Sequence, residues 1–351
     1  MRNRCVISLG SNLGDRGQAL SAAAVAIERL ASVSDVRRSR VYQTPAIGGP
    51  SNQPPFLNAC VAAETSLSAD ELIGKLQTIE AELGRERINR WAARKLDLDL
   101  ILYGRLIGSS ATATVPHPRY TVRRFVVLPA AEVAGDLRDP RFGWSLRELA
   151  DQLRMPPSDL VAKTTPSDLV ASTNASDGVA GTRSQNAEWT LAITDARPEW
   201  TERLWTEVLQ RSPAEHERSP QTVRLAADVS LHKSWKDFQG APSLWVRAFH
   251  PHRVAPVQPD EPLHPLPSGI DRPTTPPAKP MWQGDDSLAE SDRSRWPTAS
   301  QLFSGGRRQP EYWIEMGDPR WAAEELFAAA ASLTCPCQPQ ADGWGPPNQR
   351  N

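Results

Sequence analysis

The amino-acid sequence predicts an α+β fold for its first 155 residues, a mostly antiparallel sheet with helices packed on it. Strand-like and helix-like segments alternate there without the regular repeat of a doubly wound parallel sheet. At the centre, Leu and Asp alternate from Leu96 to Leu100, which is the pattern of a strand with one apolar face. The composition changes near Met155, because 24 of the 32 prolines lie at or after Pro156. The chain is therefore expected to have two parts.

Each element of the first part is predicted from periodicity and turn residues. Helices are expected where apolar residues recur three or four positions apart, as Leu72, Leu76, Ile79 and Leu83 do. The glycine-bearing turn at residues 10–15 feeds the first helix and lacks the lysine of a phosphate-binding loop, so a tight turn is favoured over a phosphate cradle. The predicted strands are 5–9, 36–42, 56–65 and 96–103, with a hairpin arm at 105–107. The predicted helices are 17–31, 69–83, 120–128 and 146–153.

The second part is predicted to be a linker, a small α/β module of uncertain fold, and a tail. Residues 156–188 are rich in Ser, Thr, Asp and Ala, as linkers are. The module spans 189–335 and contains an irregular or disordered proline-rich loop at 256–296. Residues 336–351 form the predicted tail. Within the module we expect strands at 189–193, 223–229, 244–249 and 312–316, and helices at 198–209 and 321–333.

Charge and composition restrict the class of function. The net charge is −1 and the pI is about 6.6, so no global field favours nucleic acid or a membrane. No apolar run reaches the length of a membrane span, and residues 1–4 lead into a strand without an apolar signal region. Four cysteines are too few for a disulfide framework. We therefore expect a cytoplasmic protein.

The central strand predicts a pair of carboxylates on one face. Leu96, Leu98 and Leu100 point one way, so Asp97 and Asp99 point the other. Two like charges so close are expected to hold a cation, and paired hard oxygen ligands suit Mg²⁺ carrying a phosphate substrate. The alternative is a solvated strand face, which is the commoner origin of an Asp-x-Asp pattern.

A basic arm precedes the carboxylates. Guanidinium groups match phosphate oxygens two at a time, so such an arm beside a metal site predicts a clamp on a polyphosphate. An exposed helix end with solvated charges is the alternative. The arm contains Arg85, Arg87, Arg90, Arg94 and Lys95, with Trp91 among them.

Ordered sequence motifs surround these residues. They are GSNLGD at 10–15, YQT at 42–44 with FLN at 56–58, EAELGR at 80–85, RWAARKLDLD at 90–99, and VPHP at 115–118 with RRF at 123–125. Over about residues 4–155 they resemble the motifs of the 6-hydroxymethyl-7,8-dihydropterin pyrophosphokinases of folate biosynthesis. The chain departs from the family pattern at Ala46, Ala92, Ala93, Thr112 and Pro118.

The resemblance implies a ferredoxin-like α/β sandwich and an Mg²⁺-dependent transfer of pyrophosphate from ATP to 6-hydroxymethyl-7,8-dihydropterin, releasing AMP. It implies two Mg²⁺ ions on Asp97 and Asp99, with Arg85 and Arg94 as further catalytic residues. The implied ATP-binding residues are Gln77, Glu80, Arg85, Trp91, Arg94, His117 and Arg123. The implied pterin-binding residues are Thr44, Ile47, Gly48, Phe56, Asn58 and Phe125, although each Phe could equally be a core residue.

Two other classes of protein stay open from the sequence. A nucleic-acid-binding protein would use the basic arm and would not need Asp97, but the neutral net charge argues against it. A bifunctional folate-pathway enzyme would place a second activity in the second part, which is short and irregular for a barrel enzyme. A regulatory or assembly role, or a degenerate kinase-like module, is the better expectation there, with the catalytic unit ending near Met155.

Overall fold

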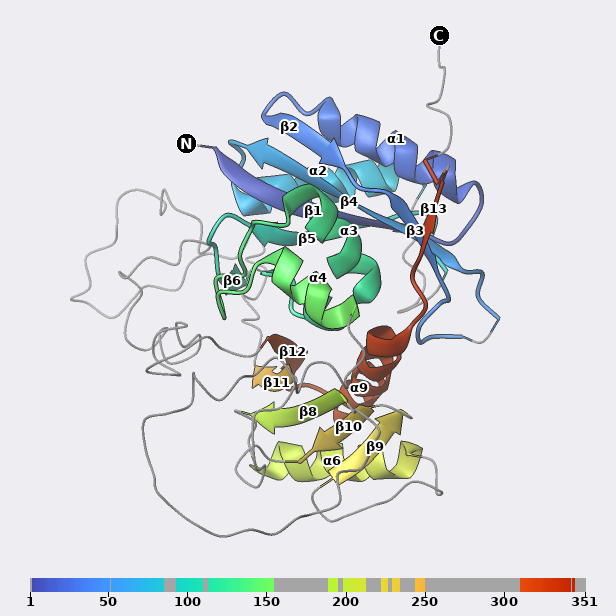
Figure 1. The fold of residues 1–351 in the computed structure, drawn as a ribbon, viewed down its shortest axis with the longest axis vertical. Helices are drawn as coiled ribbons and strands as arrows, with labels where there is room; N and C mark the ends of the chain where they lie inside the picture. Colours follow the sequence, from blue (N-terminus) through green and yellow to red (C-terminus); the bar gives the residue numbers. More distant parts are fainter. Residues whose placement is uncertain are drawn as a thin grey trace, which may run out of the picture.

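We describe the protein from a computed structural model of the chain. Two large sheets lie one beside the other, with helices on both, and a third sheet has only two strands (Figure 1). The structure describes residues 2–50, 52–84, 93–109, 113–154, 189–194, 198–212, 222–226, 229–233, 244–249, 310–341 and 343–344.

The first sheet has six strands, and every pairing in it is antiparallel. Its order is β13-β3-β4-β1-β5, and β2 also pairs with β4. This confirms the predicted α+β class and its ferredoxin-like sandwich. The strands are β1 (Asn3–Ser11), β2 (Val33–Arg38), β3 (Val41–Thr44), β4 (Phe56–Thr65), β5 (Asp97–Tyr103) and β13 (Gln338–Gln340).

Helices cover both faces of this sheet (Figure 1). On one face lie α1 (Arg16–Glu28) and α2 (Ala69–Glu82), and on the other lie α3 (Arg124–Ala134) and α4 (Leu146–Arg154). Asp15 caps α1 by accepting a hydrogen bond from the backbone N–H of Gln18, and Ser68 caps α2 in a capping box with Glu71. The two helical layers bury both faces of the sheet, so its strands are apolar on both sides.

Three predicted elements of the first part were wrong in detail. The single strand at 36–42 is two strands, β2 and β3. The hairpin predicted at 105–107 lies directly after those residues in the chain, where β6 (Gly108–Ser109) pairs with β7 (Thr114–Val115). The helix at 120–128 is a short 3₁₀ turn, η1 (Tyr120–Val122), followed by α3, because Arg123 adopts an extended conformation (φ −87°, ψ 93°) between them.

The second sheet makes the later part an α/β module. Its order is β12-β11-β8-β10-β9, parallel except for the β9–β10 pair. The strand predicted at 223–229 is the end of one strand and the start of the next. The elements are β8 (Trp189–Thr194), α6 (Pro198–Arg211), β9 (Thr222–Ala226), β10 (Val229–His232), β11 (Leu244–Phe249), β12 (Glu311–Glu315) and α9 (Pro319–Thr334).

The two parts share one apolar core. Val126 and Ala130 of α3 belong to the same buried cluster as Leu326 of α9 and Ile314 of β12. After α9 the chain returns to the first sheet, where β13 pairs with β3 (Figure 1). The predicted tail at 336–351 therefore contains a sheet strand, which the sequence missed because a three-residue strand with a proline has no clear period.

The predicted linker at 156–188 and the proline-rich loop at 256–296 lie outside the described residues. The domain boundary near Met155 stays a prediction, with the shared core across it as a new observation. Among the described residues, no helix combines the length and apolar character needed to cross a membrane.

Candidate active site

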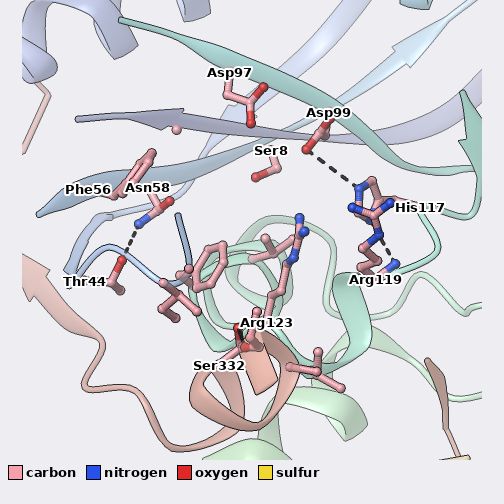
Figure 2. Close-up of a pocket in the computed structure, with 18 of the residues that line it drawn as sticks. Ser8, Thr44, Phe56, Asn58, Asp97, Asp99, His117, Arg119, Arg123 and Ser332 are labelled. Carbon is pink, nitrogen blue, oxygen red and sulfur yellow. Dashed lines mark hydrogen bonds and ion pairs between the residues drawn. The ribbon is translucent and has the colours of Figure 1, made fainter. Parts of the chain in front are cut away.

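A cavity of about 300 Å³ lies at the end of the first sheet, where β5 meets the loop after β3 and the start of α3. Figure 2 shows side chains from these elements and from α9 converging on it. Its walls are formed by Ser8, Gly10, Thr44, Pro45, Ile47, Gly48, Gln53, Phe56, Asn58, Arg94, Asp97, Asp99, His117, Arg119, Val122, Arg123, Phe125, Val126, Tyr312, Glu325, Ala328, Ala329 and Ser332.

The carboxylate strand has the predicted orientation. Leu96, Leu98 and Leu100 are buried in the core beneath α1 and α2. Asp97 and Asp99 lie on the opposite face and line the cavity (Figure 2). This face of β5 therefore borders a cavity, with the Asp99 side chain still 38% exposed, and the metal role of the two carboxylates stays a prediction.

Asp97 already has a cationic partner. The Nη1 atom of Arg94 lies 2.7 Å from Oδ2 of Asp97, and both side chains are about three-quarters buried. Arg85 and Trp91, and with them Arg87 and Arg90 of the basic arm, lie outside the described residues. Arg94 is thus the arginine of that arm that the structure places at the carboxylates.

Asn12 holds the end of the basic arm in place. Its side-chain Oδ1 accepts a hydrogen bond from the backbone N–H of Arg94 at 2.6 Å, and its backbone N–H donates to the Arg94 carbonyl at 3.0 Å. Its amide also donates to the carbonyl of Pro54 at 3.3 Å. The turn at residues 10–15 therefore ties the arginine arm to the loop before β4. The sequence suggested only a tight turn here, because hydrogen bonds between distant loops leave no periodic signal.

His117 is neutral and faces Asp99. Its Nε2 lies 3.8 Å from Oδ2 of Asp99, and its Nδ1 accepts a hydrogen bond from the backbone N–H of Arg119 at 3.2 Å. Burial, and then the charges of Arg123, Arg119 and Arg141, lower the pKa of His117 well below its usual value. Because Nδ1 accepts, the single ring proton is on Nε2, which can donate to an anionic oxygen in the cavity.

Arg123 brings a second half-buried cation to the cavity. Burial and the neighbouring Arg119 lower its pKa, although a guanidinium stays protonated at neutral pH. Its guanidinium carbon lies 6.0 Å from the ring centroid of Phe125. Cations so placed opposite Asp97 and Asp99 suit a ligand that is itself strongly anionic (Figure 2).

The predicted pterin-binding residues come together on one side of the cavity. Thr44, Ile47, Gly48, Phe56, Asn58 and Phe125 all line it. Asn58 and Thr44 are buried, and the Asn58 amide donates to Oγ1 of Thr44 at 2.9 Å. Gly48 has φ +74°, a conformation that glycine adopts at little cost. Two aromatic rings and a fixed amide give this side the features of a pocket for a flat, polar ring.

Gln77 and Glu80 are not brought to the cavity walls. Glu80 is buried in α2, and its Oε1 accepts a hydrogen bond from the backbone N–H of Leu98 at 2.7 Å. It joins α2 to the carboxylate strand, so its observed contact is structural. Gln77 is half-buried on the same helix. Their assignment to ATP stays a prediction.

Sequence reasoning missed the residues that the later part contributes. Tyr312 of β12 and Glu325, Ala328, Ala329 and Ser332 of α9 line the cavity. The apolar period of α9 predicts a helix but not the surface that the helix covers. Ser8 and Arg119 were also missed, and Arg119 stands two positions after the noted His117, the only local signal.

The carboxylate pair fits Mg²⁺ bound together with a phosphate ligand. Among the described residues, no group of three or more His, Cys, Asp or Glu side chains forms a protein cage for a metal. Mg²⁺ does not require one, because it commonly binds through one or two carboxylates, substrate phosphates and water. Asp97 and Asp99 supply the carboxylates. The side of the cavity that carries Arg119 and Arg123, here called the cationic wall, suits the phosphates.

Comparison with known proteins identifies the family. Residues 6–135 match the family model described as 7,8-dihydro-6-hydroxymethylpterin-pyrophosphokinase (HPPK). The 2-amino-4-hydroxy-6-hydroxymethyldihydropteridine pyrophosphokinase of Synechocystis is 40% identical over 148 residues, which cover 42% of this chain and 75% of that protein. The Haemophilus influenzae enzyme of the same name is 43% identical over 131 residues, covering 37% of this chain and 81% of that protein.

A weaker likeness connects the chain with a solved Plasmodium falciparum HPPK-DHPS, at TM-score 0.36 and 10% identity, covering 63% of this chain and 58% of that one. That score is too low to support a conclusion about the later part. The identity and coverage of the two curated relatives are sufficient for the first part, and by them the chain belongs to the 7,8-dihydro-6-hydroxymethylpterin-pyrophosphokinase family.

Proposed function

We propose that this chain transfers the β,γ-pyrophosphoryl group of ATP to the hydroxymethyl oxygen of 6-hydroxymethyl-7,8-dihydropterin. The new bond joins that oxygen to the β-phosphorus, and the bond from the β-phosphorus to the bridging oxygen of AMP breaks. The observation that supports this most directly is the meeting in one cavity of a carboxylate pair, half-buried cations and an aromatic pocket. These are the parts needed to hold a polyphosphate against a flat heterocycle.

The aromatic side of the cavity would bind the pterin. Phe56 and Phe125 offer faces for the bicyclic ring, while Asn58 offers an amide to its polar edge. The hydrogen bond from Asn58 to Thr44 fixes that amide before the substrate arrives. A fixed amide loses little freedom on binding, so the pocket is preorganised. Ile47 and Gly48 would complete the pocket from the loop after β3.

The cationic side would bind the phosphates of ATP. Arg94 and Arg123 can donate to phosphate oxygens in pairs, and Nε2 of neutral His117 can donate one further hydrogen bond. These donors stay in place as charge moves toward the departing AMP, so they stabilise the transition state without reorganising. The predicted contributions of Arg85 and Trp91, outside the described residues, belong to the same proposal.

Asp97 and Asp99 would hold Mg²⁺, and we propose two ions. Bound there, Mg²⁺ would neutralise charge on the transferred group and favour deprotonation of the attacking alcohol. In the structure Arg94 pairs with Asp97 at 2.7 Å. We infer that Arg94 turns from Asp97 to the phosphates when the ion and ATP bind together.

The wider setting of the enzyme is also a proposal. Its partners would be ATP and the reduced pterin, with a cytoplasmic location and no need for nucleic acid or membrane. A second folate-pathway activity in the later part is the alternative; among its described residues, no cluster of three or more His, Cys, Asp or Glu side chains could hold a metal.

A direct assay tests the proposal. Release of AMP from ATP should require both 6-hydroxymethyl-7,8-dihydropterin and Mg²⁺, and mass spectrometry should find the pterin heavier by one pyrophosphoryl group. A protein that releases ADP, or AMP without the pterin, would have a different activity.

Replacing Phe56 or Phe125 with Ala should weaken pterin binding by about 1–3 kcal/mol, the range found for loss of one aromatic stacking partner. The affinity for a non-hydrolysable ATP analogue should be nearly unchanged, because both rings lie on the aromatic side of the cavity. Calorimetric titration with each ligand measures the difference. Equal losses for both ligands, with a lower melting temperature, would mean that the rings act as core residues.

Replacing Arg94 with Ala should lower the rate of the chemical step by about 10²-fold or more, as loss of one aligned charge donor does at other active sites. Pterin affinity should change little, because Arg94 contacts Asp97 and the loop of Asn12 and not the aromatic side. Single-turnover kinetics separate chemistry from release. Normal chemistry with slow product release would assign Arg94 to opening and closing of the site.

A further inference from the structure

We propose that Glu325, in α9 of the later part of the chain, is a positioning residue of this active site. It holds the guanidinium of Arg119 against the cavity, where Arg119 contacts the polyphosphate. The inference rests on the proposed function and adds two residues to it, one of them from outside the segment that matches the family model.

The later part forms a wall of the cavity. Glu325, Ala328, Ala329 and Ser332 follow one another at helical spacing along α9 and all line it. The three small side chains leave space beside the aromatic pocket, and the hydroxyl of Ser332 donates to the Ala328 carbonyl at 2.7 Å. Figure 2 shows Ser332 on the side of the cavity opposite Asp97 and Asp99. The active site is therefore enclosed by both parts of the chain.

Strand β12 fixes the segment that carries Arg119. The backbone N–H of Trp313 donates to the carbonyl of Pro118 at 2.8 Å, and Oγ1 of Thr121 donates to the carbonyl of Glu311 at 2.8 Å. These two bonds hold the chain on either side of Arg119. The same segment lies between His117 and Arg123, so the later part fixes the backbone of the whole cationic wall.

The ion pair completes this attachment. Nη2 of Arg119 lies 3.2 Å from Oε1 of Glu325, whose side chain is only 5% exposed, while Arg119 is 25% exposed. A buried carboxylate is costly unless it is paired, and beside a site for phosphates it would also repel the ligand. The ion pair with Arg119 offsets the cost of burying the carboxylate and reduces its repulsion of the ligand. A guanidinium has further N–H donors, so one side can stay on Glu325 while the other meets phosphate oxygens.

A stacked cluster behind this wall supports its rigidity. The guanidinium carbon of buried Arg141 lies 4.8 Å from the ring centroid of Trp313 and 5.6 Å from that of Tyr120. Arg141 also pairs with buried Asp139 at 2.6 Å. Because Trp313 belongs to β12 and the others to the first part, the strand that anchors Pro118 cannot shift independently of the first part.

The test compares Glu325→Gln with Glu324→Gln in the full chain. Both changes remove one carboxylate from α9, but Glu324 does not line this cavity. Glu325→Gln should lower kcat/KM for ATP by about tenfold to a hundredfold, as expected when a catalytic group is misplaced. Affinity for the pterin and the melting temperature should change little. Glu324→Gln should behave as the unaltered chain.

A double substitution separates positioning from general stability. Arg119→Gln should lower kcat/KM for ATP by as much as Glu325→Gln does. The double variant should lower it no further than Arg119→Gln alone, because Glu325 acts through Arg119. Arg119→Gln leaves the buried Glu325 carboxylate without this ion pair, so the double variant, which lacks both charges, is the folded reference if Arg119→Gln melts at a lower temperature.

Wild-type ATP kinetics in folded Glu325→Gln or Arg119→Gln would overturn this proposal and leave the proposed function intact. Equal losses for ATP and pterin with a lowered melting temperature would also overturn it, by showing a structural role. Absence of pterin-dependent AMP release in the unaltered chain would instead refute the proposed function.

Discussion

Replacing Asp97 or Asp99 with Asn should reduce turnover by at least about 10³-fold, a loss at the upper end of that for a single electrostatic group at an active site. Asn keeps the size of the side chain but removes the charge that holds Mg²⁺, so the substitution should lower the rate of the reaction and not the stability of the fold. Each side chain is partly exposed to the cavity and neither belongs to the apolar core, so the fold should survive.

Kinetics at increasing Mg²⁺ concentration, with thermal melts in parallel, provide the measurement. Asp151→Asn is the matched control, because Asp151 lies in α4 and is 60% exposed, away from the cavity. We expect the control to keep full activity. Turnover within a few-fold of the unaltered chain in Asp97→Asn or Asp99→Asn would refute the metal assignment.

A chain cut after residue 158 should lose most of its activity. From the sequence alone a fragment of residues 1–158 is expected to fold and turn over, but the contacts across the boundary reverse that expectation. The cut removes the α9 wall of the cavity and uncovers Val126 and Ala130 of α3, which share a core with Leu326. It also removes β13, which leaves β3 as an open edge strand.

The comparison uses a second chain that ends after Trp344. That chain keeps β13 and the hydrogen bond from Nε1 of Trp344 to the Ser39 carbonyl at 2.9 Å. It should melt and turn over as the full chain does. The shorter chain should be insoluble, or should lose more than about tenfold in kcat/KM, which is about 1.4 kcal/mol. An active, cooperatively melting fragment of residues 1–158 would establish the boundary near Met155 and make the later part dispensable.

Much of the first part followed from the sequence, because its signals are local. The period of two from Leu96 to Leu100 placed Asp97 and Asp99 on the open face of β5, and the apolar core beneath Leu98 confirms it. The helical spacing of α2 and the boundaries of β4 were also predictable. Family motifs then brought together distant residues such as Phe56, Asn58 and Phe125, which line one cavity.

Only the tertiary structure decided how the later part meets the site. The sequence of an alanine-rich helix such as α9 does not indicate which surface the helix will cover, because burial depends on residues far along the chain. The pair of Arg119 with Glu325, separated by more than 200 positions, has no period and no turn signal. The sequence determined the elements and the chemistry of the first part. Long-range packing determined that α9 and β12 enclose the same cavity, since apolar residues of α3 and α4 are buried in one cluster with residues of α9 and β12.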